Sequence, residues 1–277
     1  MTRRLHFVTG KGGVGKSTVA AALALAAAHR NARVLAIELG EPAGLTRILA
    51  GSGIDVATFD GADALAEYLT IHLGRLARPI VDHPLYTAFV GAAPGLRELM
   101  AIGKIRDEFA LHDRWDTVVV DAGATGHALE HLRMPSATGE AFRSGRVHRE
   151  AAANAALLRD RARCSVHVVA TPEQMALREA AQLIGDLRQL DLATGALFVN
   201  RCVPPAPAGV DALLARIAEP TLGELLRRAR DREARQQRGI AAVEAELFVS
   251  ALRLPQLREP DGAAQAAALA RCVAEVA

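Results

Sequence analysis

Cysteines, aromatic residues and long apolar runs are all scarce in this sequence of 277 residues. The three cysteines, Cys164, Cys202 and Cys272, lie far apart and form no CxxC pair. This spacing argues against a disulfide framework and against a cysteine-rich zinc site. Aromatic residues make up only 4 % of the chain and apolar residues 51 %. The core must therefore consist mainly of Ala, Leu and Val, and the composition is that of a globular protein.

A membrane span and a strong charge of one sign are also missing. The most apolar stretch, VAAALALAAA (residues 19–28), is too short to cross a bilayer and follows a polar glycine loop. We therefore expect a buried helix there, and a cytoplasmic protein without a membrane span. The net charge of +2 does not indicate nucleic acid. The basic segment 227–238 has acidic residues at i,i+4 spacing, which favours a solvated helix face and no nucleic-acid partner.

Short apolar runs alternate with segments of helical length along most of the chain. The runs are residues 5–9, 33–38, 117–121, 165–170, 195–200 and 247–252. Strands separated by helices pair in parallel, so the predicted fold class is α/β, with a doubly wound, mainly parallel sheet and helices on both faces. The interval of approximately 51–113 shows helical leucine spacing broken by prolines. It predicts a helical insertion between the second and third strands of a single domain, 1–277.

Residues 10–18 (GKGGVGKST) carry the main chemical signal. They match GxxxxGK[ST] between a predicted strand and a predicted helix, which is the context of a phosphate-binding loop. Glycines let backbone N–H groups turn toward phosphates, and the helix N-terminus adds partial positive charge. We expect Lys16 to contact the β- and γ-phosphates and Ser17 to bind Mg²⁺. The predicted nucleotide-binding residues of this loop are Gly10, Lys11, Gly12, Gly13, Val14, Gly15, Lys16, Ser17 and Thr18.

Lys11 has no task inside its own loop. Phosphoryl transfer gains from an extra cation near the γ-phosphate, and a second chain often supplies it. The KGGVGKST form resembles the deviant Walker A motif of the switch ATPases that include nitrogenase iron protein, MinD and ArsA. This resemblance implies that Lys11 crosses a dimer interface to the nucleotide of the partner subunit.

The segment DAGATGH (121–127) follows the third predicted strand. Asp121 is placed there to reach Mg²⁺, usually through water. The segment resembles the ArsA-type switch II, DTAPTGH, at Asp121 and at the Thr-Gly-His ending, and it departs from that pattern at Gly123 and Ala124. Further ArsA-like stretches, at residues 93–105, 168–180, 198–201 and 254–257, extend the resemblance over most of the chain.

Three residues near the end of the chain are candidates to contact the base. Asn200 ends a predicted strand where this family places an asparagine against adenine. The guanine-reading NKxD pattern fails because Val203 stands where its aspartate would be, so ATP is favoured over GTP. A capping asparagine before the proline loop is the alternative. Leu254 and Pro255 are candidates to pack on the base, although a plain turn explains them nearly as well.

The first switch segment departs from the family pattern. The family usually has an aspartate after strand two that orients the attacking water, whereas here the stretch reads IELGEPAG (37–44). Gly40 takes the position of that aspartate in an ungapped alignment, Glu41 takes it after a shift of one residue, and Glu38 is a third option. A positioned base is worth roughly 10²–10⁴ in rate, so this choice separates an active ATPase from a slow switch. Glu41 is our catalytic candidate.

A further motif overlaps the end of the switch II segment. HALEH (127–131) matches the inverted zinc-protease pattern HxxEH. His127 is already accounted for by the Thr-Gly-His ending, and nothing else in the sequence supports a protease, so we assign no zinc site.

The resemblance implies an ArsA-like dimeric switch that depends on Mg²⁺ and ATP. Lys11, Lys16, Glu41 and Asp121 are the catalytic candidates, and Ser17 and Asp121 are the metal-binding candidates. ATP binding and hydrolysis would be coupled to binding or release of an unidentified client, in a homodimer or in a heterodimer with a paralogous ATPase. The alternative is a weakly hydrolysing regulatory subunit that serves a paralogue as a scaffold. A small-molecule kinase or ligase is disfavoured because no second substrate site is visible.

Overall fold

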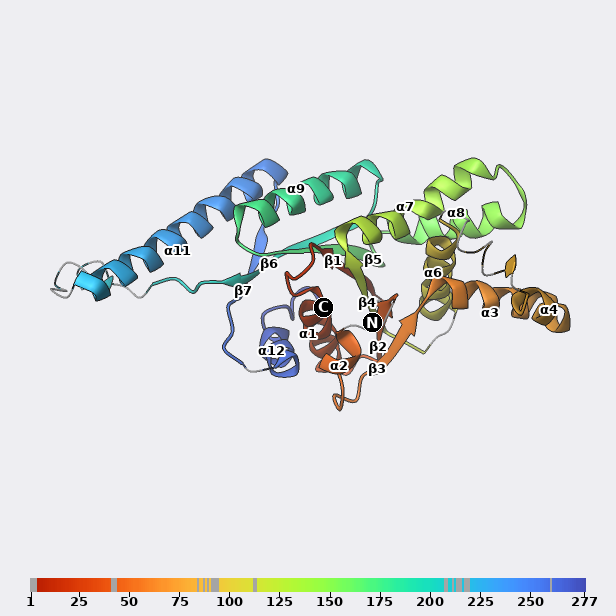
Figure 1. Cartoon of the computed structure of the whole chain (residues 1–277), viewed down its shortest axis with the longest axis horizontal. Helices are drawn as coiled ribbons and strands as arrows, with labels where there is room; N and C mark the ends of the chain where they lie inside the picture. The colour runs from red at the N-terminus through yellow and green to blue at the C-terminus, as the bar shows by residue number, and fades with distance from the viewer. Residues whose placement is uncertain are drawn as a thin grey trace.

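The fold is built on one parallel sheet (Figure 1). The computed structural model describes residues 4–40, 44–83, 85–86, 88, 90, 95–111, 114–206, 209–210, 212, 216, 220–259 and 261–277. The sheet has seven strands in the order β3-β2-β4-β1-β5-β6-β7, and every neighbouring pair is parallel. The strands are β1 (Arg4–Gly10), β2 (Val34–Leu39), β3 (Asp55–Phe59), β4 (Thr117–Ala124), β5 (Cys164–Ala170), β6 (Thr194–Cys202) and β7 (Ala251–Pro255).

Helices cover both faces of the sheet (Figure 1). The helices of the described chain are α1 (Lys16–Ala28), α2 (Leu45–Ile48), α3 (Gly61–Leu73), α4 (Arg78–Val81), α6 (Leu96–Arg106), α7 (Thr125–Ala141), α8 (Gly145–Arg159), α9 (Gln174–Gln189), α11 (Pro220–Leu247) and α12 (Gly262–Ala270), with the short helical segments η1 (Gly74–Leu76) and η2 (Asp107–Leu111). Among these helices, none combines the length and the apolar character that crossing a bilayer requires.

Two apolar clusters form the core, one on each face. On one face α1, α2 and α12 pack against strand residues such as Val8, Val119 and Phe198. On the other face α6, α7, α8, α9 and α11 pack against residues such as Phe7 and Val120. Successive strand residues point to opposite faces, so a central strand that is covered on both sides reads as a continuous apolar run. This arrangement confirms the predicted α/β, doubly wound sheet.

Helix α1 is apolar on all sides because it is enclosed. It lies between the sheet and α12, and eight of its 13 residues are buried. Alanine lets neighbouring backbones approach closely and has the highest helix propensity. The stretch predicted to be a buried helix therefore holds the phosphate-binding loop firmly against the middle of the sheet.

Two strand predictions were wrong in detail. Residues 55–59 form β3 at one edge of the sheet, inside the interval predicted to be helical, so the helices of that interval begin at Gly61. Most of β3 is partly exposed, and an edge strand of this kind lacks a continuous apolar signal. The last strand begins at Ala251 rather than at Leu247, because α11 continues to Leu247 and buries that side chain in the core.

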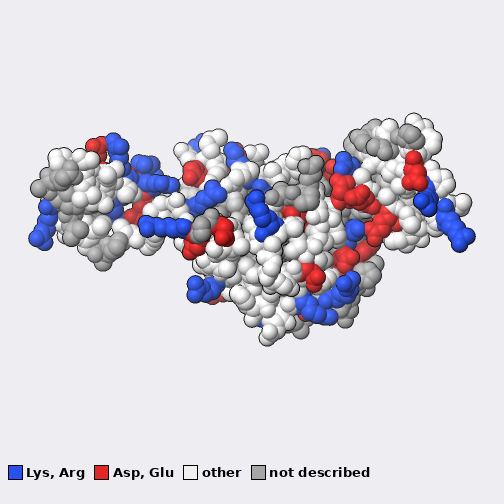
Figure 2. Space-filling view, turned by 60° about the horizontal axis from the view of Figure 1, so that its bottom comes forward, with Lys and Arg blue, Asp and Glu red and all other residues white. Residues whose placement is uncertain are grey.

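Helix α11 projects beyond the sheet at one end of the molecule (Figure 1). It has 28 residues and is therefore roughly 42 Å long. Its second half carries the buried residues Ile240, Val243 and Leu247, whereas Leu222 and Leu225 near its start are 47 % and 58 % exposed. Figure 2 shows Lys and Arg side chains along this projecting end. Arg228 pairs with Glu224 there, as expected for a solvated helix face.

Two histidines are buried side by side in the centre of the sheet. His6 of β1 and His167 of β5 stack, with 2.9 Å between His6 Nδ1 and His167 Nε2. The backbone N–H of Ala196 donates to His167 Nδ1 at 2.9 Å, so the proton of neutral His167 must be on Nε2, which donates to His6. The proton on His6 Nε2 then finds no acceptor among the described residues. A further proton on either ring would have to go on its accepting nitrogen, Nδ1, and would break the hydrogen bond made there.

This pair predicts destabilisation in acid. Burial, with smaller contributions from Arg4 and Arg30, lowers the pKa of His6 from 6.5 to about 4, and burial lowers the pKa of His167 too. The unfolded chain therefore binds more protons below pH 6.5, and stability is lost as the pH falls from 6.5 toward 4. Each histidine contributes about 1.4 kcal/mol per pH unit in that window. Urea unfolding at pH 7, 6 and 5 should show a shallower pH dependence for His6→Gln than for wild type. The exposed His29→Gln is the control, and equal slopes for all three proteins would contradict this interpretation.

Candidate nucleotide-binding site

The loop between β1 and α1 lies at the carboxyl edge of the sheet, where open α/β sheets bind ligands. Two of its glycines are required by close contacts. A Cβ atom on Gly10 would lie 2.1 Å from the carbonyl oxygen of Val169 on β5, and one on Gly15 would lie 2.4 Å from Asn200 Nδ2 on β6. Gly15 also has a left-handed backbone, with φ of 95°. The neighbouring strands therefore fix the position of the loop.

The start of α1 favours an anion. Gly15 caps the helix without a side-chain hydrogen bond, and its first turn has no acidic residue, so the free N–H groups and the helix dipole are available to a phosphate. The Nζ of Lys16 donates to the carbonyl oxygen of Lys11 at 3.1 Å. Burial lowers the pKa of Lys16, and the charge of Asp121 partly offsets this effect. The loop is preformed and places a partly buried ammonium group inside it.

Ser17 and Asp121 provide an all-oxygen site for a cation beside Lys16. The hydroxyl of Ser17 donates to Asp121 Oδ2, while Asp121 Oδ1 is buried and has no partner among the described residues. Burial raises the pKa of Asp121, and Glu38 raises it further, whereas the hydrogen bond from Ser17 and the charge of Lys16 lower it. Oxygen donors and a buried, incompletely satisfied carboxylate suit Mg²⁺. The residues present therefore fit the predicted metal.

Glu38 holds the start of α2 in place and is not open to a substrate. It is buried, and its Oε1 accepts the backbone N–H groups of Gly44 and Leu45 at 2.6 and 3.0 Å. Its Oε2 accepts the hydroxyl of Thr46 at 3.0 Å. Glu38 thus caps α2, which makes it a poor candidate for orienting water.

Gly40 and Gly44 are the other described residues of the first switch segment with informative contacts. Gly40 follows β2 and donates its N–H to the Phe59 carbonyl at 3.0 Å, and a side chain at Gly44 would contact Ser17. The first switch segment therefore returns to the metal site. Residues 41–43 lie outside the described residues, so the assignment of Glu41 stays a prediction.

Asn200 contacts the phosphate-binding loop directly. Its Nδ2 donates to the carbonyl oxygen of Val14 at 2.8 Å, and its Oδ1 accepts the backbone N–H of Arg201 at 2.9 Å. The side chain is only 5 % exposed. Asn200 therefore supports the loop and accepts a bond from the next residue of its own strand, which continues to Cys202. Contact with adenine is neither required nor shown by these bonds.

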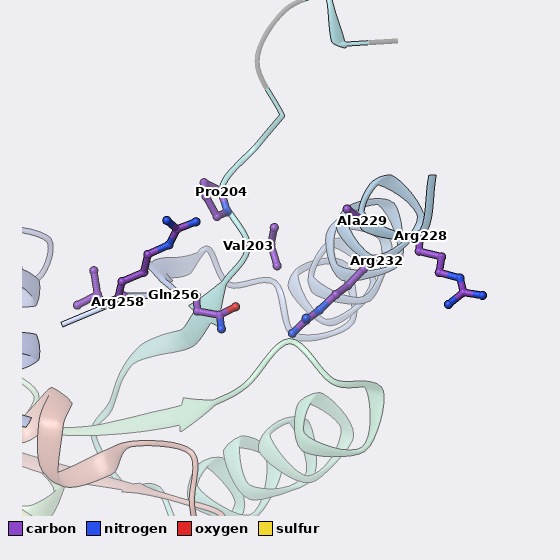
Figure 3. Close-up of a pocket in the computed structure, with 8 residues that line it drawn as sticks. Val203, Pro204, Arg228, Ala229, Arg232, Gln256 and Arg258 are labelled. Atoms are coloured by element: carbon purple, nitrogen blue, oxygen red, sulfur yellow. The ribbon is translucent and has the colours of Figure 1, made fainter. Parts of the chain in front are cut away.

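The other two base candidates lie at the end of β7. Leu254 is fully buried in the apolar cluster that also contains residues of α1 and α12, whereas Pro255 is partly exposed. Beside Pro255 is a half-open hollow of about 580 Å³. It is lined by Val203, Pro204, Arg228, Ala229, Arg232, Gln256, Leu257 and Arg258. Figure 3 shows Arg232 extending from α11 toward the end of β7, Arg258 alongside Pro204, and Arg228 pointing outward.

Lys11 makes an ion pair within its own chain. Its Nζ lies 2.6 Å from Glu179 Oε1 on α9. In the second switch segment, Thr125, Gly126 and His127 form the first turn of α7, and the carbonyl of His127 is 2.7 Å from His131 Nδ1. Among the described residues, no three His, Cys, Asp or Glu side chains form a group that could hold a metal ion.

This geometry defines the class as a P-loop nucleotide-binding protein. The profile of the CobQ/CobB/MinD/ParA nucleotide-binding domain matches residues 5–249. The chain therefore belongs to that family.

Known relatives agree with the resemblance to ArsA-type ATPases. ATPase BagA of Mycobacterium tuberculosis is 31 % identical over 224 residues, which cover 73 % of this chain and 66 % of that protein. The arsenical pump-driving ATPases of Acidiphilium multivorum and Escherichia coli are 26 % and 25 % identical over 247 residues, which cover 76 % of this chain and 41 % of each relative. The chain thus spans slightly less than two thirds of BagA and under half of the other two proteins.

The structure adds residues that the sequence did not point to. Glu179 lies 168 positions from Lys11 along the chain, and no local pattern connects them. Arg232 and Arg258 meet at one hollow from α11 and from the end of β7. The sequence analysis interpreted segment 227–238 only as a solvated helix face, so it gave no signal for this hollow.

The position of Asn200 generates a prediction that separates support of the loop from base recognition. Asn200→Ala leaves the buried carbonyl of Val14 without its donor, which should weaken binding of ATP, GTP and inorganic pyrophosphate alike, by roughly fivefold. Titration calorimetry with each ligand and Mg²⁺ measures this. A loss confined to ATP would instead identify Asn200 as a reader of adenine.

Proposed function

We propose that this chain is an ArsA-like ATPase that works as a dimeric switch, with ATP as substrate and Mg²⁺ as cofactor. The observation that carries the proposal is the convergence of Lys16, Ser17 and Asp121 at the start of α1. A purely structural loop does not need a buried carboxylate beside a partly buried ammonium group and an uncapped helix. Family membership and the names of the relatives support ATP hydrolysis.

Each residue of the site has a role that follows from its place. Lys16 exchanges the Lys11 carbonyl for the β- and γ-phosphates, and the N–H groups of the loop bind the remaining phosphate oxygens. Ser17 and Asp121 would hold Mg²⁺, which neutralises charge that develops on the phosphates during transfer. Arg232 and Arg258, which line the hollow beside Pro255, would be candidates to stack on the base. Thr18 lies in the first turn of α1 and would contact the same phosphates.

Lys11 is the reason to propose a dimer. Its side chain is 48 % exposed and is paired with Glu179 rather than directed into its own loop. An exposed cation at the rim of a nucleotide site can reach a γ-phosphate bound by a second, similar subunit. Closure of two subunits on ATP would then convert nucleotide state into binding or release of a client.

The second candidate function is a regulatory subunit that binds nucleotide and hydrolyses it poorly. The capping role of Glu38 favours it, because one of the three options for a water-orienting group is already bound to backbone N–H groups. Glu41 decides between the two functions. A heterodimer with a paralogous ATPase would supply a complete first switch from the other chain.

Nucleotide binding should raise the melting temperature. At an ATP concentration about 100-fold above Kd, Mg²⁺-ATP stabilises the fold by about 2.7 kcal/mol, or roughly 5–10 °C for a domain of this size. Lys16→Ala should abolish the shift because it removes the ammonium group that binds the phosphates. Differential scanning fluorimetry with ATP, GTP and no nucleotide measures it, with Lys104→Ala as a control remote from the loop. A shift that survives in Lys16→Ala would refute this site.

The first switch generates a prediction about turnover. Glu41→Gln should slow steady-state phosphate release by about 10²-fold or more without changing ATP affinity, if Glu41 orients water. Glu38→Gln should instead lower the melting temperature, because it loses a charged cap worth about 1.5–3 kcal/mol. Normal turnover in Glu41→Gln would exclude that residue. Barely detectable turnover in wild type that rises on adding a paralogous chain would favour the regulatory function.

A further inference from the structure

The ion pair between Lys11 and Glu179 joins an open loop to a fixed helix. Helix α9 is anchored to the core by buried residues on either side of Glu179, among them Leu177 and Ala180. The two charged side chains are 48 % and 38 % exposed. A pair with this exposure is only weakly stabilising, because water competes for both charges. The contact therefore positions Lys11 and can be exchanged for another partner.

Lys11 is held at two points in the subunit without nucleotide. Its ammonium group contacts Glu179, and its backbone carbonyl accepts a hydrogen bond from Lys16 Nζ. Phosphates that bind Lys16 remove the second contact. A nucleotide in the loop thus loosens residue 11 on its own subunit before any partner arrives.

We propose that Glu179 is a latch that retains Lys11 on its own subunit and so opposes ATP-dependent dimer closure. This inference rests on the proposed function, since it needs a second subunit whose bound nucleotide competes for Lys11. In the closed dimer the phosphate charge replaces the Glu179 carboxylate as the partner of Lys11. Glu179 is thus a positioning residue, which acts on the reaction only through Lys11.

Symmetry sets the size of the effect. An exposed ion pair shifts an equilibrium by between about 1.4-fold and about fivefold. A two-fold symmetric dimer has to open both latches, so the factors multiply. Removing the Glu179 carboxylate should therefore tighten ATP-dependent dimerisation by between about twofold and about 25-fold. The affinity of a single subunit for ATP should stay unchanged.

The chain offers a clean probe of the contact itself. It has three lysines, Lys11, Lys16 and Lys104, so amine acylation followed by peptide mass spectrometry reads Lys11 separately, with Lys104 as an internal standard. Without nucleotide, Lys11 should react faster in Glu179→Gln than in wild type. Asp186→Asn is the matched control, because it removes another carboxylate from α9 that makes no ion pair among the described residues. Equal labelling of Lys11 in all three proteins would overturn the latch.

Sedimentation velocity at graded protein concentrations, with and without Mg²⁺-ATP, tests the consequence. We expect tighter dimerisation for Glu179→Gln and wild-type behaviour for Asp186→Asn. An unchanged dimerisation constant for Glu179→Gln refutes the latch while leaving the dimeric switch intact. Weaker dimerisation also refutes it and shows that Glu179 acts across the interface. If every protein, including wild type, stays monomeric with ATP, the homodimeric form of the switch is wrong.

Discussion

The hydrogen bond between Ser17 and the buried Asp121 is the interaction on which the rest of the site depends. It joins the first turn of α1 to β4 and so connects the phosphate-binding loop to the central sheet. A buried carboxylate is expensive unless it is paired, and here only one of its two oxygens has a partner in the described structure. Lys16 and Ser17 offset part of the charge, while Glu38 adds to it. The remaining imbalance is what makes this position suited to a divalent cation.

Contacts from the neighbouring strands fix the loop and the start of α2. Asn200 holds the Val14 carbonyl, and the backbone of Val169 excludes any side chain at residue 10. Glu38 fastens the start of α2 beside the metal site. Strands β5 and β6 therefore fix the loop and β2 fixes the start of α2, whereas the side chain of Lys11 at the rim of the loop is 48 % exposed. Lys16, the candidate to bind phosphate, and Lys11, the candidate to contact a partner, are only five positions apart in the sequence.

The sequence predicts the centre of this molecule well because the signals there are local. A buried parallel strand, a glycine loop and an alanine-rich helix are each continuous in the chain, so the sheet and the phosphate site follow from residues 5–28. The edge strand Asp55–Phe59 was missed because an exposed edge carries no apolar run. The burial of Leu254 was not predicted either, because it depends on how distant segments pack together. The partners of Glu38 and Lys11 could not be predicted, because an ion pair or a cap depends on how distant segments fold together.

Helix α11 is packed against the rest of the molecule mainly along one of its halves, and this has a mechanical consequence. It is clamped at its carboxyl-terminal half, where Gly239 lies close against Leu177 of α9 and Arg188 donates to the Leu247 carbonyl at 2.9 Å. Its other half has few buried residues, so the helix is supported mainly where it contacts α9. A tilt of about 10° at Ile240 displaces Leu222 by roughly 5 Å, given a rise of about 1.5 Å per residue. Helix α9 therefore supports α11 on one side and carries Glu179, the partner of Lys11, on another.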